Sequence, residues 1–138
     1  MRPRESLLYR WVEDAVKGID RRAVSWKLQD QFRSGLPDQL VCVSGRAAWI
    51  ESKQLHGTRP QPVGLTAQQY GHLTSWHAAG GHCGLLVAWN DWIYWIVPPN
   101  LPNPAELVHH ARLRELAGSD CVVPYDKRSC AALMQHVL

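Results

Sequence analysis

The arrangement of apolar and polar positions along the chain predicts a series of short helices and strands. Residues 5–19 carry apolar side chains at helical spacing on one stripe, which predicts an amphipathic helix. Further helices are predicted over residues 66–79 and 105–117 and at the C-terminal end of the sequence. Short apolar runs bounded by turn residues predict strands at 24–27, 39–43, 47–53, 85–89, 92–97 and 121–123.

The predicted strands at 39–43 and 47–53 have apolar residues on adjacent as well as alternate positions, so we expect helices on both faces of the sheet. The predicted fold class is therefore α/β, with a central sheet flanked by helices. Residues 1–97 are interpreted as the core. Because the proline-rich run 98–104 interrupts regular structure, residues 98–138 are interpreted as a C-terminal extension packed on the same single domain.

The composition indicates a globular protein and argues against a membrane-spanning one. With 46% hydrophobic and 20% charged residues, the chain of 138 residues has the composition of one globular domain. No apolar run approaches the roughly 18 residues of a membrane span, and the first residues lack the apolar core of a signal peptide. We therefore expect a cytoplasmic protein without membrane association. Residues 1–60 hold 11 Lys and Arg against 7 Asp and Glu, a balance that permits nucleic-acid binding without establishing it.

The most informative residues flank a predicted hairpin turn. If Ser44 and Gly45 form a two-residue turn, the ladder that follows from it places Asp38 directly opposite Glu51. Side chains opposed in this way have Cβ atoms about 4.5–5.5 Å apart. Lys53 is two residues beyond Glu51 and so lies on the same face of the strand. Two carboxylates and one ammonium group are therefore expected to converge on one patch.

This patch has the chemistry of phosphodiester hydrolysis. Two carboxylates so close together repel each other unless a cation lies between them, and Mg²⁺ prefers oxygen ligands of this kind. A metal-bound water can attack the phosphorus while the Lys53 ammonium group orients that water or offsets negative charge. An exposed hairpin in which Lys53 forms only a cross-strand ion pair is an equally compatible interpretation of these three residues alone.

Two further polar residues each have a catalytic and a structural interpretation. Glu5 lies on the buried stripe of the first predicted helix, so it is either a third carboxylate of the site or a favourable charge in the first turn of that helix. Gln69 shares a stripe with Leu73 and Trp76 and can point toward the site. It also completes a capping box with Thr66 at the start of its own helix. The sequence leaves both alternatives open.

Taken in order, these motifs resemble the PD-(D/E)XK nuclease superfamily, and within it the small stand-alone VRR-NUC nucleases of phages and bacteria. The resemblance covers about residues 5–97. It rests on Glu5, Gly35-Leu36-Pro37-Asp38, Glu51-Ser52-Lys53 and Leu65-Thr66 with Gln69, Leu73, Trp76 and Gly80. By this resemblance, Glu5 would match the family's first-helix glutamate and Gln69 its downstream glutamine.

The resemblance implies a restriction-endonuclease-like core, a mixed sheet flanked by helices, and a DNA endonuclease that depends on Mg²⁺ or Mn²⁺. Asp38 and Glu51 would bind the metal with help from the Ser52 carbonyl, and Lys53 would be the catalytic lysine. Stand-alone members of this kind are similar to homodimeric Holliday-junction resolvases, which implies branched DNA as the substrate. Two paired sites in a homodimer could cut both strands of a two-fold junction. The setting would be the cytoplasm of a bacterial or phage-infected cell.

Candidate contacts to DNA come from basic and aromatic residues. Phosphate contacts are predicted at Arg21, Arg22, Lys27, Arg33 and Arg59, although ordinary solvated charge is an equally compatible interpretation of each. Tryptophans can stack on bases. The four on predicted helix and strand faces are instead expected to belong to the core: Trp11, Trp49, Trp76 and Trp89.

Two other classes of function remain as alternatives. Residues 98–138 match nothing in the family, so a non-catalytic nucleic-acid-binding or assembly subunit that retains the nuclease fold is the main alternative. A zinc-binding interaction module would rest on His72, His77, His82 and Cys83. Their spacing fits no standard zinc site.

Overall fold

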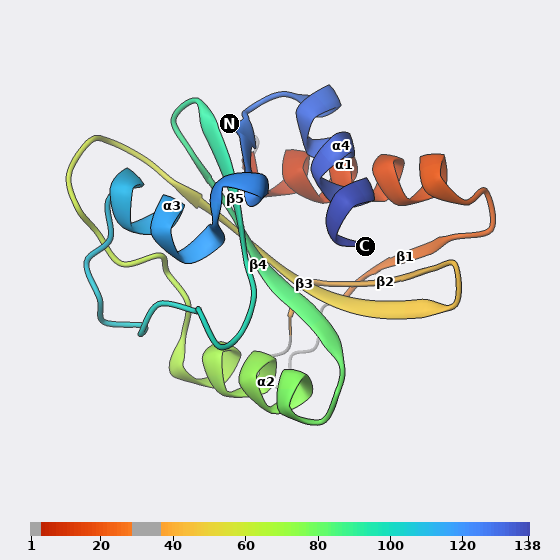
Figure 1. Cartoon of the computed structure of the whole chain (residues 1–138), viewed down its shortest axis with the longest axis horizontal. Helices are drawn as coiled ribbons and strands as arrows, with labels where there is room; N and C mark the ends of the chain where they lie inside the picture. Colours follow the sequence, from red (N-terminus) through yellow and green to blue (C-terminus); the bar gives the residue numbers. More distant parts are fainter. Residues whose placement is uncertain (1–3, 29–36) are drawn as a thin grey trace.

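A six-stranded sheet runs through the molecule, with the strands in sequence order from one edge to the other (Figure 1). The computed structural model describes the backbone of residues 4–28 and 37–138 and, within those ranges, the side chains from residue 7 onward. The main elements are α1 (Arg4–Ile19), β1 (Val24–Lys27), β2 (Gln39–Val43), β3 (Arg46–Leu55), α2 (Ala67–Ala78), β4 (His82–Trp89), β5 (Trp92–Ile96), α3 (His110–Ala117), β6 (Val122–Pro124) and α4 (Lys127–Val137).

The sheet is mixed because of a single crossover. Strands β3 and β4 are parallel, and α2 makes the connection that a parallel pair requires. The other neighbouring strands are antiparallel. None of the described helices is long and apolar enough to cross a lipid bilayer.

Helices cover both faces of the sheet, as the sequence predicts. On one face α1 and α4 pack against each other over a core that includes Leu8 and Met134. On the other face α2 and α3 cover a second core that includes Leu73 and Leu113 (Figure 1). The predicted α/β class with a mixed, helix-flanked sheet is therefore confirmed.

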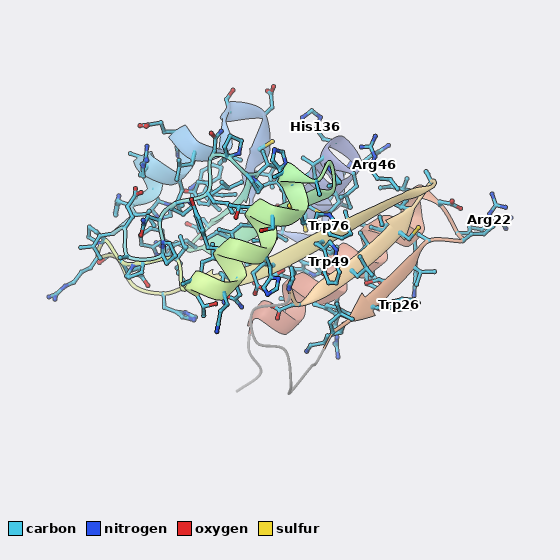
Figure 2. All side chains as sticks on the ribbon, turned by 90° about the horizontal axis from the view of Figure 1, so that it is seen from below. Arg22, Trp26, Arg46, Trp49, Trp76 and His136 are labelled. Carbon is cyan, nitrogen blue, oxygen red and sulfur yellow. The ribbon has the colours of Figure 1, made fainter. Side chains whose placement is uncertain are left out.

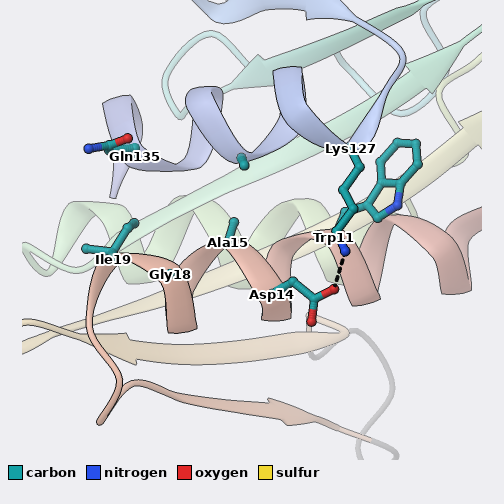
Figure 3. A pocket seen from close by; sticks show the side chains of 8 residues that line it. Trp11, Asp14, Ala15, Gly18, Ile19, Lys127 and Gln135 are labelled. Atoms are coloured by element: carbon teal, nitrogen blue, oxygen red, sulfur yellow. Dashed lines mark ion pairs between the residues drawn. The ribbon is translucent and has the colours of Figure 1, made fainter.

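Residues 98–138 contribute to this architecture. β6 pairs with β5 and forms an edge of the sheet, and α4 lies beside α1. Figure 3 shows the groove of about 260 Å³ between these two helices, where Lys127 Nζ lies 3.0 Å from Asp14 Oδ2. Both side chains are largely exposed, so this ion pair adds at most about 1 kcal/mol and the buried side chains of α4 hold the helix in place. A domain boundary at residue 97 stays a prediction.

Helix α3 begins later than the sequence predicts. The expected helix over residues 105–117 starts only at His110. The segment before it pairs with a distant loop, where Gln61 N donates to Val108 O at 3.1 Å and Val108 N donates to Gln61 O at 2.9 Å. These hydrogen bonds hold Val108 extended and buried, so a tertiary contact overrides the local helical preference.

Gly84 on β4 is expected to be sensitive to substitution. A Cβ atom there would lie 2.3 Å from Trp95 Cζ2 in the interior, so we expect Gly84→Ala to lower the free energy of unfolding by about 1–3 kcal/mol in urea titrations. Gly18→Ala in α1 is the matched control because its added Cβ meets nothing within 4 Å. This control should be neutral or stabilising by up to about 1 kcal/mol. Wild-type stability in Gly84→Ala would contradict the described packing.

Candidate active site

The predicted acidic hairpin is formed by β2 and β3. The register is the predicted one, and continued by one residue beyond β2 it places Asp38 opposite Glu51. The turn residues Ser44 and Gly45 have φ values of 51° and 79°, the backbone shape that two-residue hairpin turns favour. Local turn chemistry therefore brings the two carboxylates together.

Side-chain alternation along β3 decides which face carries the site. Ile50 belongs to the core beneath α1 and α4, whereas Leu55 belongs to the core beneath α2 and α3. Glu51 and Lys53 are in step with Leu55 and therefore face the α2 side. Ser52 faces the opposite way, so only its backbone carbonyl is available to this site.

The Glu51 carboxylate is buried without neutral hydrogen-bond donors. Its side chain is 1% exposed, and Lys53 Nζ lies 3.6 Å from Oε2. Within the described part of the chain, neither carboxylate oxygen of Glu51 accepts a hydrogen bond. Burying an ionised carboxylate in this way is unfavourable unless a positive charge compensates it. The geometry therefore favours a cation at Glu51.

The buried position of Glu51 also changes the pKa of its carboxyl group. Burial raises the pKa of Glu51 to about 8, and the neighbouring Asp38 carboxyl adds to the rise. Lys53 acts in the opposite direction because its positive charge favours the ionised form. In the metal-free protein Glu51 is therefore largely protonated at neutral pH, and a metal that binds there must displace this proton.

The donor set fits a hard divalent cation. Mg²⁺ commonly takes one or two carboxylates from a protein and keeps several water ligands. Asp38 and Glu51 supply two carboxylates, and the two buried oxygens of Glu51 have no hydrogen-bond partner among the described residues. Among the described side chains, no group of three or more His, Cys, Asp or Glu could hold a metal ion. The predicted third carboxylate, Glu5, lies near the start of α1, and its side chain is outside the described residues.

Two of the four residues considered for zinc, His82 and Cys83, have partners within the fold. His82 Nε2 lies 2.7 Å from Val137 O, and Cys83 Sγ donates to Leu73 O at 3.3 Å. Burial raises the pKa of the Cys83 thiol to about 11, which disfavours the thiolate that zinc requires. Both side chains therefore contribute to packing and hydrogen bonding within the fold.

Gln69 closes the capping box predicted at the start of α2. Its Oε1 accepts a hydrogen bond from Thr66 N at 3.0 Å, and Thr66 Oγ1 accepts one from Gln69 N at 3.0 Å. The capping role predicted for Gln69 is therefore confirmed. Its contribution to catalysis stays a prediction.

The predicted phosphate contacts lie at separate places. Arg21 and Arg22 are exposed in the turn before β1, close to the β2–β3 turn. Arg59 is exposed in the loop that follows β3, at the other end of that strand, and Lys27 is exposed at the end of β1. Arg33 lies outside the described residues. The described residues of this set therefore do not form one continuous patch.

Of the four tryptophans expected in the core, Trp11 and Trp49 are partly buried and Trp76 is the most exposed. Trp89 is fully buried, but 38% of Trp76 is exposed. Trp26, in a segment that the sequence suggests could approach the metal or DNA, is 58% exposed. The expectation for Trp76 is corrected because this residue lies in the last turn of α2, where its ring packs edge-on against Trp49 and stays partly exposed. The periodicity of a sequence shows which residues share a face, but not how much of that face its neighbours cover.

Solved structures with a similar fold are known, although no protein-family model and no curated protein matches the chain. Hjc from Archaeoglobus fulgidus, a Holliday junction resolvase, is 13% identical, with a TM-score of 0.52 over 77% of this chain and 89% of that chain. A VRR_NUC domain is 20% identical, with a TM-score of 0.49 over 64% of this chain and 87% of that chain. The likeness to the resolvase confirms the restriction-endonuclease-like fold inferred from the motifs.

Proposed function

We propose that this protein is a Mg²⁺- or Mn²⁺-dependent endonuclease that hydrolyses phosphodiester bonds in DNA. The observation that carries the proposal is the buried Glu51 carboxylate beside Asp38, with the Lys53 ammonium group 3.6 Å from Glu51. The backbone fold, which is similar to that of a Holliday junction resolvase, supports it. A buried carboxylate with a raised pKa, next to a second carboxylate, is unfavourable for stability and is typical of functional sites.

Each residue of the site has a chemical role in this proposal. A bound Mg²⁺ or Mn²⁺ would polarise a phosphoryl oxygen and lower the pKa of a bound water. Asp38 and Glu51 would hold the ion, with the Ser52 carbonyl and Glu5 as further ligands. The Lys53 ammonium group would lie beside the reacting phosphate. There it orients the attacking water and stabilises the charge that develops on the phosphate oxygens.

Branched DNA is the proposed substrate, and a homodimer in the cytoplasm is the proposed active form. A two-fold junction presents two equivalent strands, and two sites related by a dimer axis can cut both. Arg21, Arg22 and Arg59 would contact phosphates on either side of the hairpin. Sedimentation equilibrium should then give twice the chain mass at the concentrations used for cleavage.

The decisive experiment is cleavage of a labelled four-way junction beside flap and linear duplex DNA of matched sequence. We expect paired cuts in the junction with Mg²⁺ or Mn²⁺, and none with EDTA. Cleavage of flap or duplex DNA alone would support the nuclease activity but contradict the proposed preference for four-way junctions. Binding without any cleavage would instead support the non-catalytic alternative.

Thr66→Ala and Gln69→Ala separate the two roles of Gln69. Both variants remove the capping box, so each should lower the free energy of unfolding by about 1 kcal/mol in thermal melts. We expect Gln69 also to contact the reacting groups. The cleavage rate should then fall further in Gln69→Ala than in Thr66→Ala. Equal cleavage rates for the two variants would leave Gln69 with the capping role alone.

A further inference from the structure

The sheet face that carries Glu51 continues beyond α2 as an apolar surface. Side chains from β1, β2 and β3 line a hollow of about 140 Å³, and we call these five residues the open face: Val24, Trp26, Leu40, Cys42 and Ala47. Trp26 is 58% exposed and Val24 is 40% exposed although both are apolar. Contiguous exposed apolar surface commonly marks a binding site.

Trp76 lies next to this surface with its indole ring held in one orientation. Trp76 Nε1 donates to His82 O at 3.0 Å, and the ring packs edge-on against Trp49 with centroids 5.5 Å apart. A Cβ atom at Gly81 would lie 2.2 Å from Trp76 Nε1, so glycine allows this close approach. Because the ring is fixed and still partly exposed, a ligand could stack on it with little loss of conformational entropy.

Figure 2 shows Trp76, Trp49 and Trp26 in a row that crosses from α2 to β1. The row passes beside the candidate active site, because Trp49 precedes Glu51 by two residues on the same face of β3. Trp26 is two strands away, and ordinary strand spacing puts its backbone about 12 Å from that of Glu51. This distance is roughly three or four base steps of a stacked strand, so a DNA strand cut at Glu51 can reach Trp26.

Positive and titratable groups border the open face. A second hollow of about 550 Å³ shares Ala47 with it and is lined by Arg46, His77 and His82. Arg46 and Arg22 both lie at this end of the sheet (Figure 2), and Lys53 lies on the same face of β3 as Trp49. Arg46 pairs with Val43 and therefore projects from the opposite face of its strand. Aromatic surface beside cations matches the bases and phosphates of a nucleic-acid strand.

We propose that the open face and Trp76 bind unpaired bases of the DNA strand that is cut, with Trp26 and Trp76 stacking on those bases. This inference rests on the proposed nuclease function and specifies its substrate. Bases in a continuous duplex are already stacked and paired, and extracting them costs free energy. Branch points and bulges present bases without that cost, so the open face would favour DNA of this kind.

The test measures DNA binding by fluorescence anisotropy without divalent metal, using a labelled single strand and a continuous duplex of the same sequence. We expect Trp26→Ala to bind the single strand about 10-fold more weakly, as expected for one lost stacking contact, with duplex binding unchanged. Trp26→Phe should retain most of the affinity because it keeps an aromatic ring. Leu107→Ala is the matched control, since Leu107 is 65% exposed and lies in the segment before α3.

The possible outcomes distinguish this inference from its alternatives. If Trp26→Ala weakens binding equally to the single strand and the duplex, or weakens neither, the stacking role of Trp26 is wrong. If Trp26→Ala dissociates a dimer in sedimentation experiments without weakening single-strand binding, the open face is a contact between copies and the inference is wrong.

A cleavage assay on the same proteins separates the stacking role from the nuclease function. Wild-type cleavage together with unchanged single-strand binding by Trp26→Ala would refute the stacking alone. Binding that depends on Trp26, without cleavage in Mg²⁺ or Mn²⁺, would support the stacking and refute the nuclease.

Discussion

Lys53→Ala is expected to lower the single-turnover rate of DNA cleavage by about 10²–10⁴-fold while the protein stays folded. The substitution removes the ammonium group that lies 3.6 Å from Glu51 and faces the proposed phosphate position. It also removes the charge that favours ionised Glu51, so the pKa of Glu51 should rise further and metal should bind more weakly. Cleavage rates measured over a range of Mg²⁺ concentrations distinguish a slower chemical step from weaker metal binding.

Lys127→Ala is the matched control for this experiment. It removes the same charge from the chain, but Lys127 pairs with Asp14 on the helical layer formed by α1 and α4. We expect its cleavage rate to equal that of the wild type. Equal losses in Lys53→Ala and Lys127→Ala would show that net charge, rather than the site, controls the rate. Full activity in Lys53→Ala would remove Lys53 from the mechanism.

Glu51→Gln should abolish cleavage and yet stabilise the metal-free protein at high pH. Burial raises the pKa of Glu51 from 4.5 to about 8, so the folded protein holds this proton more tightly than the unfolded chain. Wild-type stability therefore falls as pH rises from about 4.5 to 8, because the unfolded chain loses the proton first. Glutamine cannot ionise, so the stability advantage of the variant should grow by on the order of 5 kcal/mol across this window.

Urea unfolding with EDTA at several pH values measures this difference. Glu115→Gln is the control, since it makes the same chemical change at a side chain that is 70% exposed. Saturating Mn²⁺ should stabilise the wild type and leave Glu51→Gln unchanged. A pH-independent difference between the wild type and Glu51→Gln would mean that Glu51 ionises normally, which would contradict its described burial.

Features determined by neighbouring residues could be predicted from the sequence. The apolar stripe of the first helix, the turn at Ser44 and Gly45, and the capping box of Thr66 and Gln69 each depend on residues a few positions apart. The opposition of Asp38 and Glu51 belongs to this group, because a hairpin turn determines the register of its own strands.

Features that depend on distant segments could not be predicted. The late start of α3 depends on the pairing of Val108 with Gln61, and the exposure of Trp76 depends on how its ring packs against Trp49. The raised pKa of Glu51 likewise depends on the surrounding fold that buries it. The hairpin register predicted from the sequence brings Asp38 and Glu51 together. Only the structure shows that Glu51 is buried.

The packing of α4 on α1 has a consequence for the order of folding. These helices are more than 100 residues apart in the sequence, so their contact closes a long loop at a high entropic cost, whereas the β2–β3 hairpin closes locally. We therefore expect Asp38 and Glu51 to meet early, while solvent still screens their repulsion. Docking of α4 then completes the layer on the opposite face of the sheet. Assembly of the carboxylate pair and consolidation of the core beneath it would be separate kinetic events.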